Sequence, residues 1–251
     1  MNSVTPLVSI IISTLNSEKY LEKALESSIG QSYLNREIIL IDGLSTDNTV
    51  NIIKKYSEKI KYWKSESDTG IYNAWNKGLK VANGEWICFI GSDDEWYSNK
   101  SLELLVKSAN IKKNSNFVSG KIFITNEYNN FVSSMGKKWD IKKIRNNITI
   151  GHPGSLHKKN LFNEYGLFNE DYKICGDYEF LIRNRKFINA NFVNNYVVRM
   201  KNSGISNKKP FLAFKESARA LSQNLKLGLY FSIKFYFWSI FKYVIKKLIA
   251  K

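Results

Sequence analysis

Residues 86–94 read Trp-Ile-Cys-Phe-Ile-Gly-Ser-Asp-Asp, so a run of five apolar residues is followed by Gly-Ser and then by two adjacent carboxylates. A short apolar run bounded by turn-forming residues is typical of a strand buried on both faces. In open parallel sheets, ligands bind beyond the carboxyl ends of the strands. We therefore expect Asp93 and Asp94 at the mouth of a ligand-binding crevice, although Asp and Ser after a strand also form ordinary turns.

The residues before this stretch repeat the same pattern of apolar run and helical segment. Strands are predicted at 8–12, 38–41 and 60–63, and a helix is predicted over 71–82, with Asn83-Gly84 as its stop. Strands that alternate with helical segments are the signature of a mostly parallel sheet. The expected fold is therefore α/β, a Rossmann-like central sheet flanked by helices.

The pattern is looser beyond residue 115. Residues 117–119 and 121–125 are predicted as two strands, with a hairpin turn at Asn129-Asn130. A helix is predicted to begin around Asp177, and residues 196–200 are predicted to close the sheet.

Composition limits the class of protein. The 251 residues carry 38 Lys or Arg against 22 Asp or Glu, a net charge of +16, but 43% apolar and 14% aromatic content predicts a folded chain. Cys88 and Cys175 have no metal-ligand spacing, which favours a reducing compartment and disfavours zinc or iron–sulfur sites. Because the N-terminus does not resemble a secretory signal, a cytosolic catalytic body is expected.

Several catalytic motifs are missing from the sequence. No GxxxxGK[ST] loop or GxGxxG fingerprint follows the first predicted strand, which argues against P-loop NTPases and dinucleotide-dependent oxidoreductases. No GxSxG elbow is present, and His152 and His157 are the only histidines, so a Ser-His hydrolase has little support. A nucleotide would have to be held by carboxylates and by a hard divalent cation on its diphosphate.

Four ordered motifs carry a family resemblance. They are PLVSIIISTLN at 6–16, IDGLSTDNT at 41–49, SDTGIYNAWNKG at 67–78 and GEWICFIGSDD at 84–94. The sequence resembles family 2 glycosyltransferases with a GT-A fold, and the resemblance continues through His152, GLFN at 166–169 and GDYEF at 176–180. It covers roughly residues 6–206.

The resemblance implies inverting sugar transfer from a nucleotide-diphosphate sugar, most simply a UDP-sugar, with Mn²⁺ or Mg²⁺. By position it implies a catalytic base at Asp177, a metal ligand at Asp94, and nucleotide-sugar contacts from Thr14, Asn16, Asp42, Asp68, Lys77 and Asp93. Three positions depart from the family pattern, namely Leu44, Asn73 and Gly176, where the family's common Glu-Asp pair is Gly-Asp.

The predicted roles fit elementary mechanism, yet the same residues have structural alternatives. An acceptor hydroxyl needs a carboxylate to take its proton, and a departing diphosphate needs cationic stabilisation. Asp177 at a helix start is also a possible N-cap, and Asp42 a possible turn residue. His152 is a candidate for the diphosphate or the acceptor, or a loop histidine bonded to backbone. Trp96 is a candidate to line a sugar pocket.

The excess charge is concentrated in the last 44 residues. Residues 208–251 hold ten Lys or Arg and one acidic residue, Glu216, interleaved with many aromatic residues. At 100° per residue, Lys234, Lys242 and Lys246 fall within an arc of about 120° opposite a broad apolar face. We expect a catalytic domain over 1–207 and, over 208–251, an amphipathic region that lies on an anionic membrane. The alternatives are a terminal helix packed on the domain or on a second subunit, or a true membrane span.

The sequence therefore predicts a glycosyltransferase of surface-polysaccharide assembly, peripheral on the cytoplasmic face of the inner membrane. Its acceptor is expected to be a saccharide or a polyprenyl-linked saccharide. Two alternatives are a sugar-nucleotide-forming nucleotidyltransferase and a basic nucleic-acid-binding module. The first usually carries a Gly-rich basic loop after its first strand, which residues 13–17 lack. The second would arrange its cations along a groove rather than in an aromatic tail, so no nucleic-acid partner is expected.

Overall fold

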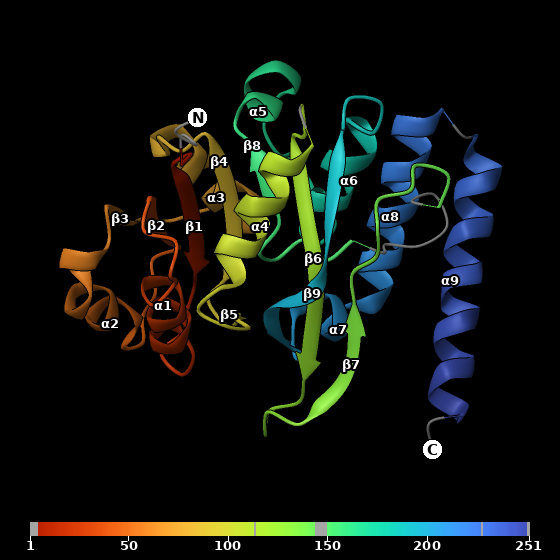
Figure 1. Ribbon diagram of the computed structural model, residues 1–251. Coiled ribbons are helices and arrows are strands. Elements are labelled where there is room, and N and C mark those ends of the chain that lie inside the picture. Colours follow the sequence, from red (N-terminus) through yellow and green to blue (C-terminus); the bar gives the residue numbers. More distant parts are fainter. Residues whose placement is uncertain (1–4, 113, 144–149, 227, 250–251) are drawn as a thin grey trace.

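The computed structural model describes residues 5–112, 114–143, 150–226 and 228–249. The described strands form one sheet in the order β3-β2-β1-β4-β8-β6-β9-β5, with β7 paired to β6 (Figure 1). Its first half is parallel and consists of β1 (Val8–Thr14), β2 (Arg36–Asp42), β3 (Tyr62–Ser65) and β4 (Trp86–Gly91). The continuous apolar runs predicted β1, β2 and β4, because a parallel sheet is covered on both faces. β3, predicted at 60–63, is found at Tyr62–Ser65 as a partly exposed strand at the end of the sheet.

Helices cover both faces of this half-sheet. The helices and turn between its strands are α1 (Leu21–Ile29), α2 (Thr49–Lys55), the short η1 (Ser57–Lys59) and α3 (Ile71–Val81). Successive residues of β1 point to opposite faces, so Ile10 packs in a cluster with Leu21 of α1, whereas Ile11 packs in a cluster with Leu79 of α3. The expected α/β sheet flanked by helices is confirmed.

The second half of the sheet mixes strand directions. It contains β5 (Glu95–Trp96), β6 (Phe117–Thr125), β7 (Phe131–Met135), β8 (Leu156–Lys158) and β9 (Ala190–Lys201). β8 is antiparallel to both β4 and β6, while β6 and β9 are parallel. The two strands predicted at 117–119 and 121–125 are one strand, β6, whose pairing with β9 shifts register at Gly120 and Lys121.

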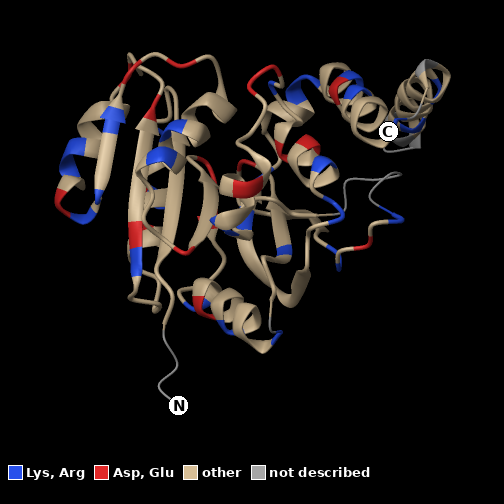
Figure 2. Ribbon diagram, turned by 90° about the horizontal axis from the view of Figure 1, so that it is seen from above, with Lys and Arg blue, Asp and Glu red and all other residues tan. Residues whose placement is uncertain are grey.

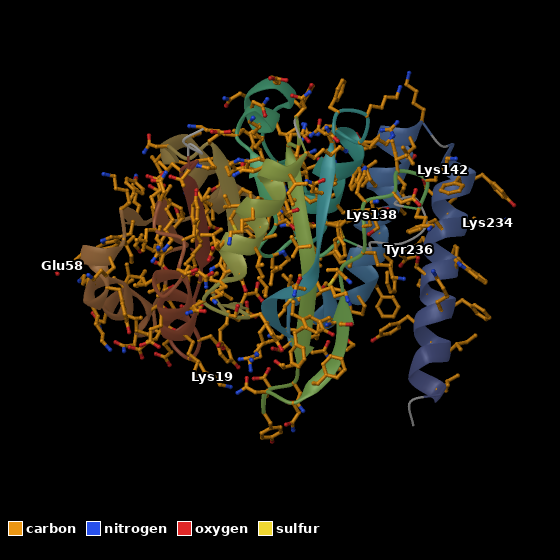
Figure 3. The ribbon with its side chains drawn as sticks, viewed as in Figure 1. Lys19, Glu58, Lys138, Lys142, Lys234 and Tyr236 are labelled. Carbon is orange, nitrogen blue, oxygen red and sulfur yellow. The ribbon has the colours of Figure 1, made fainter. Side chains whose placement is uncertain are left out.

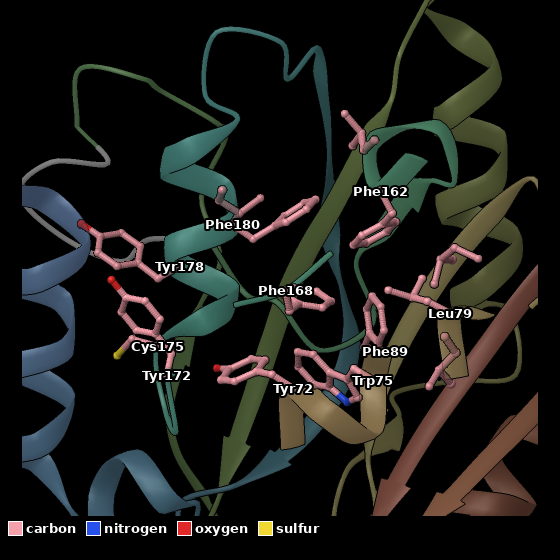
Figure 4. Packing of buried hydrophobic residues seen from close by; sticks show 14 of the residues in the cluster. Tyr72, Trp75, Leu79, Phe89, Phe162, Phe168, Tyr172, Cys175, Tyr178 and Phe180 are labelled. Atoms are coloured by element: carbon pink, nitrogen blue, oxygen red, sulfur yellow. The ribbon is translucent and has the colours of Figure 1, made fainter. Parts of the chain in front are cut away.

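Helices α4 (Ser101–Ile111), α5 (Asn160–Tyr165) and α6 (Gly176–Arg183) complete the body. On the face that carries α3 and α6, an aromatic cluster fills the core, and Figure 4 shows Tyr72, Trp75, Phe89, Phe168 and Phe180 gathered there. The rings of Trp75 and Phe89 lie 4.6 Å apart. This packing fixes α3 and α6, which both begin at the same edge of the sheet.

The C-terminal region forms α7 (Ile205–Lys208), α8 (Pro210–Leu225) and α9 (Leu229–Ile249). α8 lies beside α6, with Ala220 and Leu221 buried in the core cluster, and α9 lies beyond α8 at the edge of the molecule (Figures 1 and 2). The predicted division at residues 207 and 208 therefore leaves in the tail a helix that shares the core of the preceding residues. Among the described helices, none has both the length and the apolar character needed to cross a bilayer.

Candidate active site

A cavity of about 650 Å³ opens where β1 and β4 end and where α3 and α6 begin. Six of the residues singled out from the sequence line it: Thr14, Asp68, Asp93, Asp94, His152 and Asp177. They come from five separate segments of the chain, which the sheet topology brings to one edge. The expectation that the acids after the strands face a common crevice is met for Asp68, Asp93 and Asp94.

Asp94 is a buried carboxylate with one unsatisfied oxygen. Its side chain is 4% exposed, and Oδ2 accepts the backbone N–H of Gly91 at 3.1 Å. Oδ1 has no hydrogen-bond partner among the described residues. Burial, and then the neighbouring charge of Asp93, raises the pKa of Asp94 well above its usual range. Burial also raises the pKa of Asp93. Both carboxylates are therefore held where a cation would relieve a desolvation cost.

Asp177 is the second residue of α6 and lines the same cavity. Burial raises its pKa to about 6. Opposing that shift, its own carboxylate accepts hydrogen bonds, including one from the Tyr72 hydroxyl at 3.2 Å. A carboxylate with a pKa just below neutrality is suited to act as a general base, because it is ionised at pH 7 yet still basic enough to accept a proton.

Gly176 explains how Tyr72 reaches this position. A Cβ atom at Gly176 would lie 2.7 to 2.9 Å from three atoms of the Tyr72 ring, so a side chain there would displace the ring. The departure from the family's Glu-Asp pair therefore has a local cause, since the ring of Tyr72 occupies the space beside Asp177.

Thr14, at the end of β1, and Asp68, in the loop before α3, also line the cavity. The Thr14 hydroxyl is buried and has no partner in the described structure. Asp68 accepts the N–H of Gly70 at 2.8 Å through Oδ1. Its Oδ2 lies 2.7 Å from where a Cβ of Gly43 would be, so glycine at 43 allows Asp68 to approach the end of β2.

Three predicted nucleotide contacts do not line this cavity. Asp42 is fully buried, and its carboxylate accepts the N–H of Ser45 at 3.0 Å and the hydroxyl of Ser65 at 2.6 Å. Asn16 is exposed and accepts the N–H of Thr46 at 2.9 Å, which fixes the loop beside Asp42. Lys77 pairs with Glu66 at 3.1 Å and donates to the carbonyl of Ser67 at 2.7 Å, so its ammonium group is already engaged.

The structure contradicts the expectation that Trp96 lines a sugar pocket. Trp96 is 4% exposed, packs in the core cluster that contains α1 and α4, and donates its indole N–H to Ser28 at 3.2 Å. His152, in contrast, does line the cavity. It is 4% exposed, its ring stacks on Trp75 at 5.1 Å, and neither ring nitrogen has a partner among the described residues. Burial lowers the pKa of His152 to about 3, so the ring is neutral at pH 7.

The sequence interpretation missed several cavity residues. Trp75 is a buried core residue that also lines the cavity, and it donates its indole N–H to Ser13 at 3.1 Å. Lys173, Lys201 and Lys209 also line the cavity, and they come from the loop before α6, from the end of β9 and from the residue before α8. No local motif marks them, because only the tertiary fold brings these three cations to one place.

One observation indicates that the cavity is suited to a divalent cation. Oδ1 of Asp94, a residue that lines the cavity, is buried and has no hydrogen-bond partner among the described residues. No group of three or more His, Cys, Asp or Glu side chains arranged to hold a metal occurs among the described residues. Mg²⁺ and Mn²⁺ are commonly bound by one or two carboxylates together with substrate phosphates, so a complete protein cage is not required.

Comparison with known proteins agrees with this geometry. The family model for glycosyl transferase family 2 matches residues 9–183, which include β1 to β4 and Asp177. The match covers more than half of the chain, and the chain therefore belongs to this family. It is a glycosyltransferase, and neither a nucleotidyltransferase nor a nucleic-acid-binding module is needed to account for its motifs.

Two relatives match over most of both chains. A PGL/p-HBAD biosynthesis glycosyltransferase of Mycobacterium tuberculosis is 30% identical over 232 residues, 89% of this chain and 87% of the relative. The UDP-Glc:alpha-D-GlcNAc-diphosphoundecaprenol beta-1,3-glucosyltransferase WfgD of Escherichia coli is 32% identical over 223 residues, 85% of this chain and 83% of the relative.

Solved structures support the GT-A fold. TarS 1-349 of S. aureus in complex with UDP matches with a TM-score of 0.67 at 22% identity, over 91% of this chain and 69% of that one. The mannosyltransferase PcManGT of Pyrobaculum calidifontis, in complex with GDP-Man and Mn²⁺, matches with a TM-score of 0.70 at 17% identity, over 90% of this chain and 66% of that one. The predicted fold class is confirmed.

Proposed function

We propose that this protein transfers a sugar, with inversion, from a UDP-sugar to a lipid-linked saccharide during surface-polysaccharide synthesis. The observation that carries the proposal is that a buried carboxylate, Asp94 after β4, and a partly buried one, Asp177 at the start of α6, line one cavity. One supplies a cation site for the departing diphosphate, and the other supplies a base for the attacking hydroxyl. Direct transfer with inversion needs a base in the protein that takes the proton of the acceptor hydroxyl.

Asp177 acts as the base in this proposal. Ionised at neutral pH, it accepts the proton of the acceptor hydroxyl as that oxygen attacks the anomeric carbon. The hydrogen bond from Tyr72 orients the carboxylate.

The donor is held by residues on the other segments. Thr14, Asp68 and Asp93 are assigned to the nucleoside and ribose, with Asp42 and Asn16 shaping the loop that closes on the base. Asp94 is assigned to Mn²⁺ or Mg²⁺, which would supply positive charge to the leaving diphosphate. The unpartnered nitrogens of His152 make it a candidate for the cation or the diphosphate.

Three lysines, at positions 173, 201 and 209, add positive charge to the same cavity. WfgD, one of the relatives, is named for a UDP-Glc donor and a diphosphoundecaprenol acceptor, which supports this choice of substrates.

Helix α9 is the proposed contact with an anionic membrane surface. Five of its exposed apolar residues recur at helical spacing: Ile233, Phe237, Phe241, Val244 and Leu248. Its other side packs on the body through Phe231 and Phe235. In Figure 3, Lys234 lies on the outer side of α9, whereas Tyr236 lies on the side toward α8. Exposed lysines beside an apolar stripe suit anionic headgroups above an acyl boundary. The side chain of Lys246 lies outside the described residues.

In this proposal, membrane contact, packing on the body and catalysis are carried out by different residues of the chain. The exposed stripe of α9 adjoins a groove that Ile233 and Phe237 line together with Arg219 of α8. No described residue of α9 lines the active-site cavity, so membrane contact through the stripe leaves the cavity's walls intact. An acceptor anchored by a lipid would then meet an active site held near the same surface. Peripheral attachment on the cytoplasmic face of the inner membrane follows from this proposal, since nucleotide sugars are made in the cytosol.

A panel of nucleotide sugars tests the reaction class. Each donor is incubated with Mn²⁺ or Mg²⁺ and a short lipid-linked saccharide, and release of nucleoside diphosphate is measured for the wild-type chain and for Asp177→Asn. We expect acceptor-dependent release from a UDP-sugar that the substitution abolishes. Release from no donor, or equal release by both chains, would overturn the proposal.

A further inference from the structure

Glu216 is the one acidic residue of the C-terminal region, and it is buried. It lies on α8 and is 6% exposed, although it is surrounded in sequence by Lys215 and Arg219. A buried carboxylate is costly unless its oxygens are satisfied by strong hydrogen bonds. The position of its partners therefore indicates what the residue does.

The carboxylate of Glu216 accepts three consecutive backbone N–H groups. Oε1 accepts from Lys173 at 2.9 Å, and Oε2 accepts from Ile174 at 2.8 Å and from Cys175 at 2.9 Å. These residues form the loop that leads into α6, and Asp177 follows two residues after the last of them. Three charge-assisted bonds to adjacent amides leave that loop little freedom.

Further contacts from α8 fix the same loop. Tyr172 donates its hydroxyl to Gln223 at 3.0 Å, and the guanidinium of Arg219 lies 4.8 Å from the Tyr172 ring. From the opposite side, the Tyr72 hydroxyl on α3 donates to the carbonyl of Ile174 at 2.7 Å. The loop is therefore clamped between α8 and α3, and each backbone N–H at 173–175 is satisfied by one side chain.

We propose that Glu216 is a positioning residue for Asp177, and that α8 is consequently part of the catalytic unit rather than of the membrane-binding tail. This inference rests on the proposed function, in which Asp177 is the base. Glu216 does not line the cavity and does not touch the substrate; it acts through the backbone of residues 173–175. A misplacement of about 1 Å in a catalytic group costs roughly a hundredfold in rate, so a loosened loop would slow transfer without removing the donor site.

Glu216 also acts on Asp177 through its charge. The titratable groups that interact with the Asp177 carboxyl include the Tyr72 hydroxyl on α3, the Cys175 thiol before α6 and Glu216 on α8. The cavity that Asp177 lines also holds the charged or titratable side chains of Asp68, Asp93, Asp94, His152, Lys173, Lys201 and Lys209. Burial is the main cause of the raised pKa of Asp177, and the negative charge of Glu216 raises it further. Replacing Glu216 by a neutral residue should therefore move the pKa of Asp177 downward.

The test compares Glu216→Gln with a matched control, Glu179→Gln. Glu179 is also a buried glutamate between α6 and α8, but its carboxylate pairs with Arg183 and Asn224 instead of with the backbone N–H groups of the loop. Hydrogen exchange measured by mass spectrometry reports the amides of 173–175 without any substrate. We expect exchange at these amides to accelerate at least about tenfold in Glu216→Gln, with the strands β1 and β4 unchanged, and no such local change in the control.

Turnover is then measured for the same variants with UDP release as the readout. For Glu216→Gln we expect kcat to fall by about 10- to 100-fold, KM for the donor to stay within about threefold, and the acid limb of the kcat profile to move to lower pH. Glu216→Asp keeps the charge but shortens the side chain, so it should lower kcat and leave the limb closer to its wild-type position.

Three results would overturn the inference. If hydrogen exchange at 173–175 is unchanged in Glu216→Gln, Glu216 does not hold the loop. If exchange accelerates but kcat is unchanged, Glu216 does not position Asp177 for catalysis. Accelerated exchange throughout the sheet would make Glu216 a residue of general stability instead. Failure of the proposed function is separately visible, because an active Asp177→Asn variant removes the base whatever the Glu216 variants do.

Discussion

The phenolic oxygen of Tyr72 lies 3.2 Å from Oδ1 of Asp177 and 2.7 Å from the carbonyl oxygen of Ile174. A phenol has one proton, so these two acceptors share one donor. The hydroxyl thus links the candidate base to the loop that carries it. Its hydrogen bond lowers the pKa of Asp177, in opposition to burial, which raises it.

Tyr72→Phe should therefore move the acid limb of the kcat profile to higher pH. The substitution removes the donor and keeps the ring that packs on Gly176, so the main change is the loss of a bond to the ionised form of Asp177. The pH profile of UDP release checks this outcome, and Glu216→Gln should move the same limb in the opposite direction. A limb that stays in place would mean that the hydroxyl does not act on the base.

Wild-type activity should fall as the pH drops through about 6, because burial raises the pKa of Asp177 to about 6 and protonation then removes the base. The steady-state rate between pH 5 and 8 should follow one ionisation on the acid side. UDP binding measured by calorimetry over the same range is the control, since it separates protonation of the base from loss of donor affinity. A flat profile would contradict the assignment of Asp177.

Asp177→Asn should lower kcat by at least about a hundredfold while UDP binding stays within about threefold of wild type. The amide keeps the shape of the carboxyl group but accepts no proton at neutral pH. Glu179→Gln, two residues along α6, is the control for disturbance of the helix. Loss of UDP binding in Asp177→Asn would show that the residue serves the donor instead of the acceptor.

The same substitution should stabilise the fold at neutral pH. The folded pKa of Asp177, about 6, lies above its ordinary value of 3.8, so folding favours the protonated form. This favourable contribution is complete below pH 3.8 and is lost as the pH rises through 6. A pKa difference of about two units corresponds to about 3 kcal/mol. Relative to wild type, the free energy of unfolding of Asp177→Asn should therefore be higher at pH 7.5 than at pH 3.5 by about this amount. Urea unfolding of both chains at the two pH values measures it, and an identical difference at both values would refute it.

Asp94→Asn should weaken UDP binding in the presence of Mn²⁺ by about tenfold or more and leave metal-free binding nearly unchanged. The reason is that the unpartnered Oδ1 of Asp94 is the buried oxygen best suited to a cation. Calorimetric titrations with and without Mn²⁺ give the comparison, and Glu103→Gln on the exposed side of α4 is the control. Equal loss of affinity with and without metal would remove Asp94 as a ligand.

Substituting Phe237 and Phe241 together by Ser should reduce binding to vesicles that contain anionic lipid. These residues lie on the exposed stripe of α9, and they are 63% and 53% exposed. The matched control replaces Tyr128 and Phe131 together by Ser, since these two residues are also exposed aromatic residues and lie in the β6–β7 hairpin, away from α9. Co-sedimentation measures binding, and equal loss in both double variants would show that the effect is not specific to α9.

The parallel half of the fold could be predicted because its strands are local signals. β1, β2 and β4 are continuous apolar runs, and each ends at a residue whose position at the sheet edge follows from the strand's direction. β3 contains Lys64, is partly exposed, and lies two residues beyond its predicted position. Asp68, Asp93 and Asp94 were predictable at the cavity because each follows a predicted strand. Asp177 needed the family resemblance, since a carboxylate at a helix start is equally typical of an N-cap.

The remaining site residues depend on contacts between distant segments. Trp96 follows the aspartate pair, but β5 pairs with β9, and this pairing turns the indole into the core against α1. Glu216 could not be recognised as a loop clamp, because its surroundings in the sequence are cationic and apolar and its partners are backbone amides some forty residues away. Backbone partners carry no signal in the sequence.

The contact between Gly176 and the Tyr72 ring constrains substitution at position 176. Any side chain at position 176 collides with the ring, so a change from Gly-Asp to the family's usual Glu-Asp pair requires a smaller residue at position 72. Gly176→Glu should consequently displace the ring of Tyr72 and disturb Asp177, unless Tyr72 is replaced by a smaller residue as well.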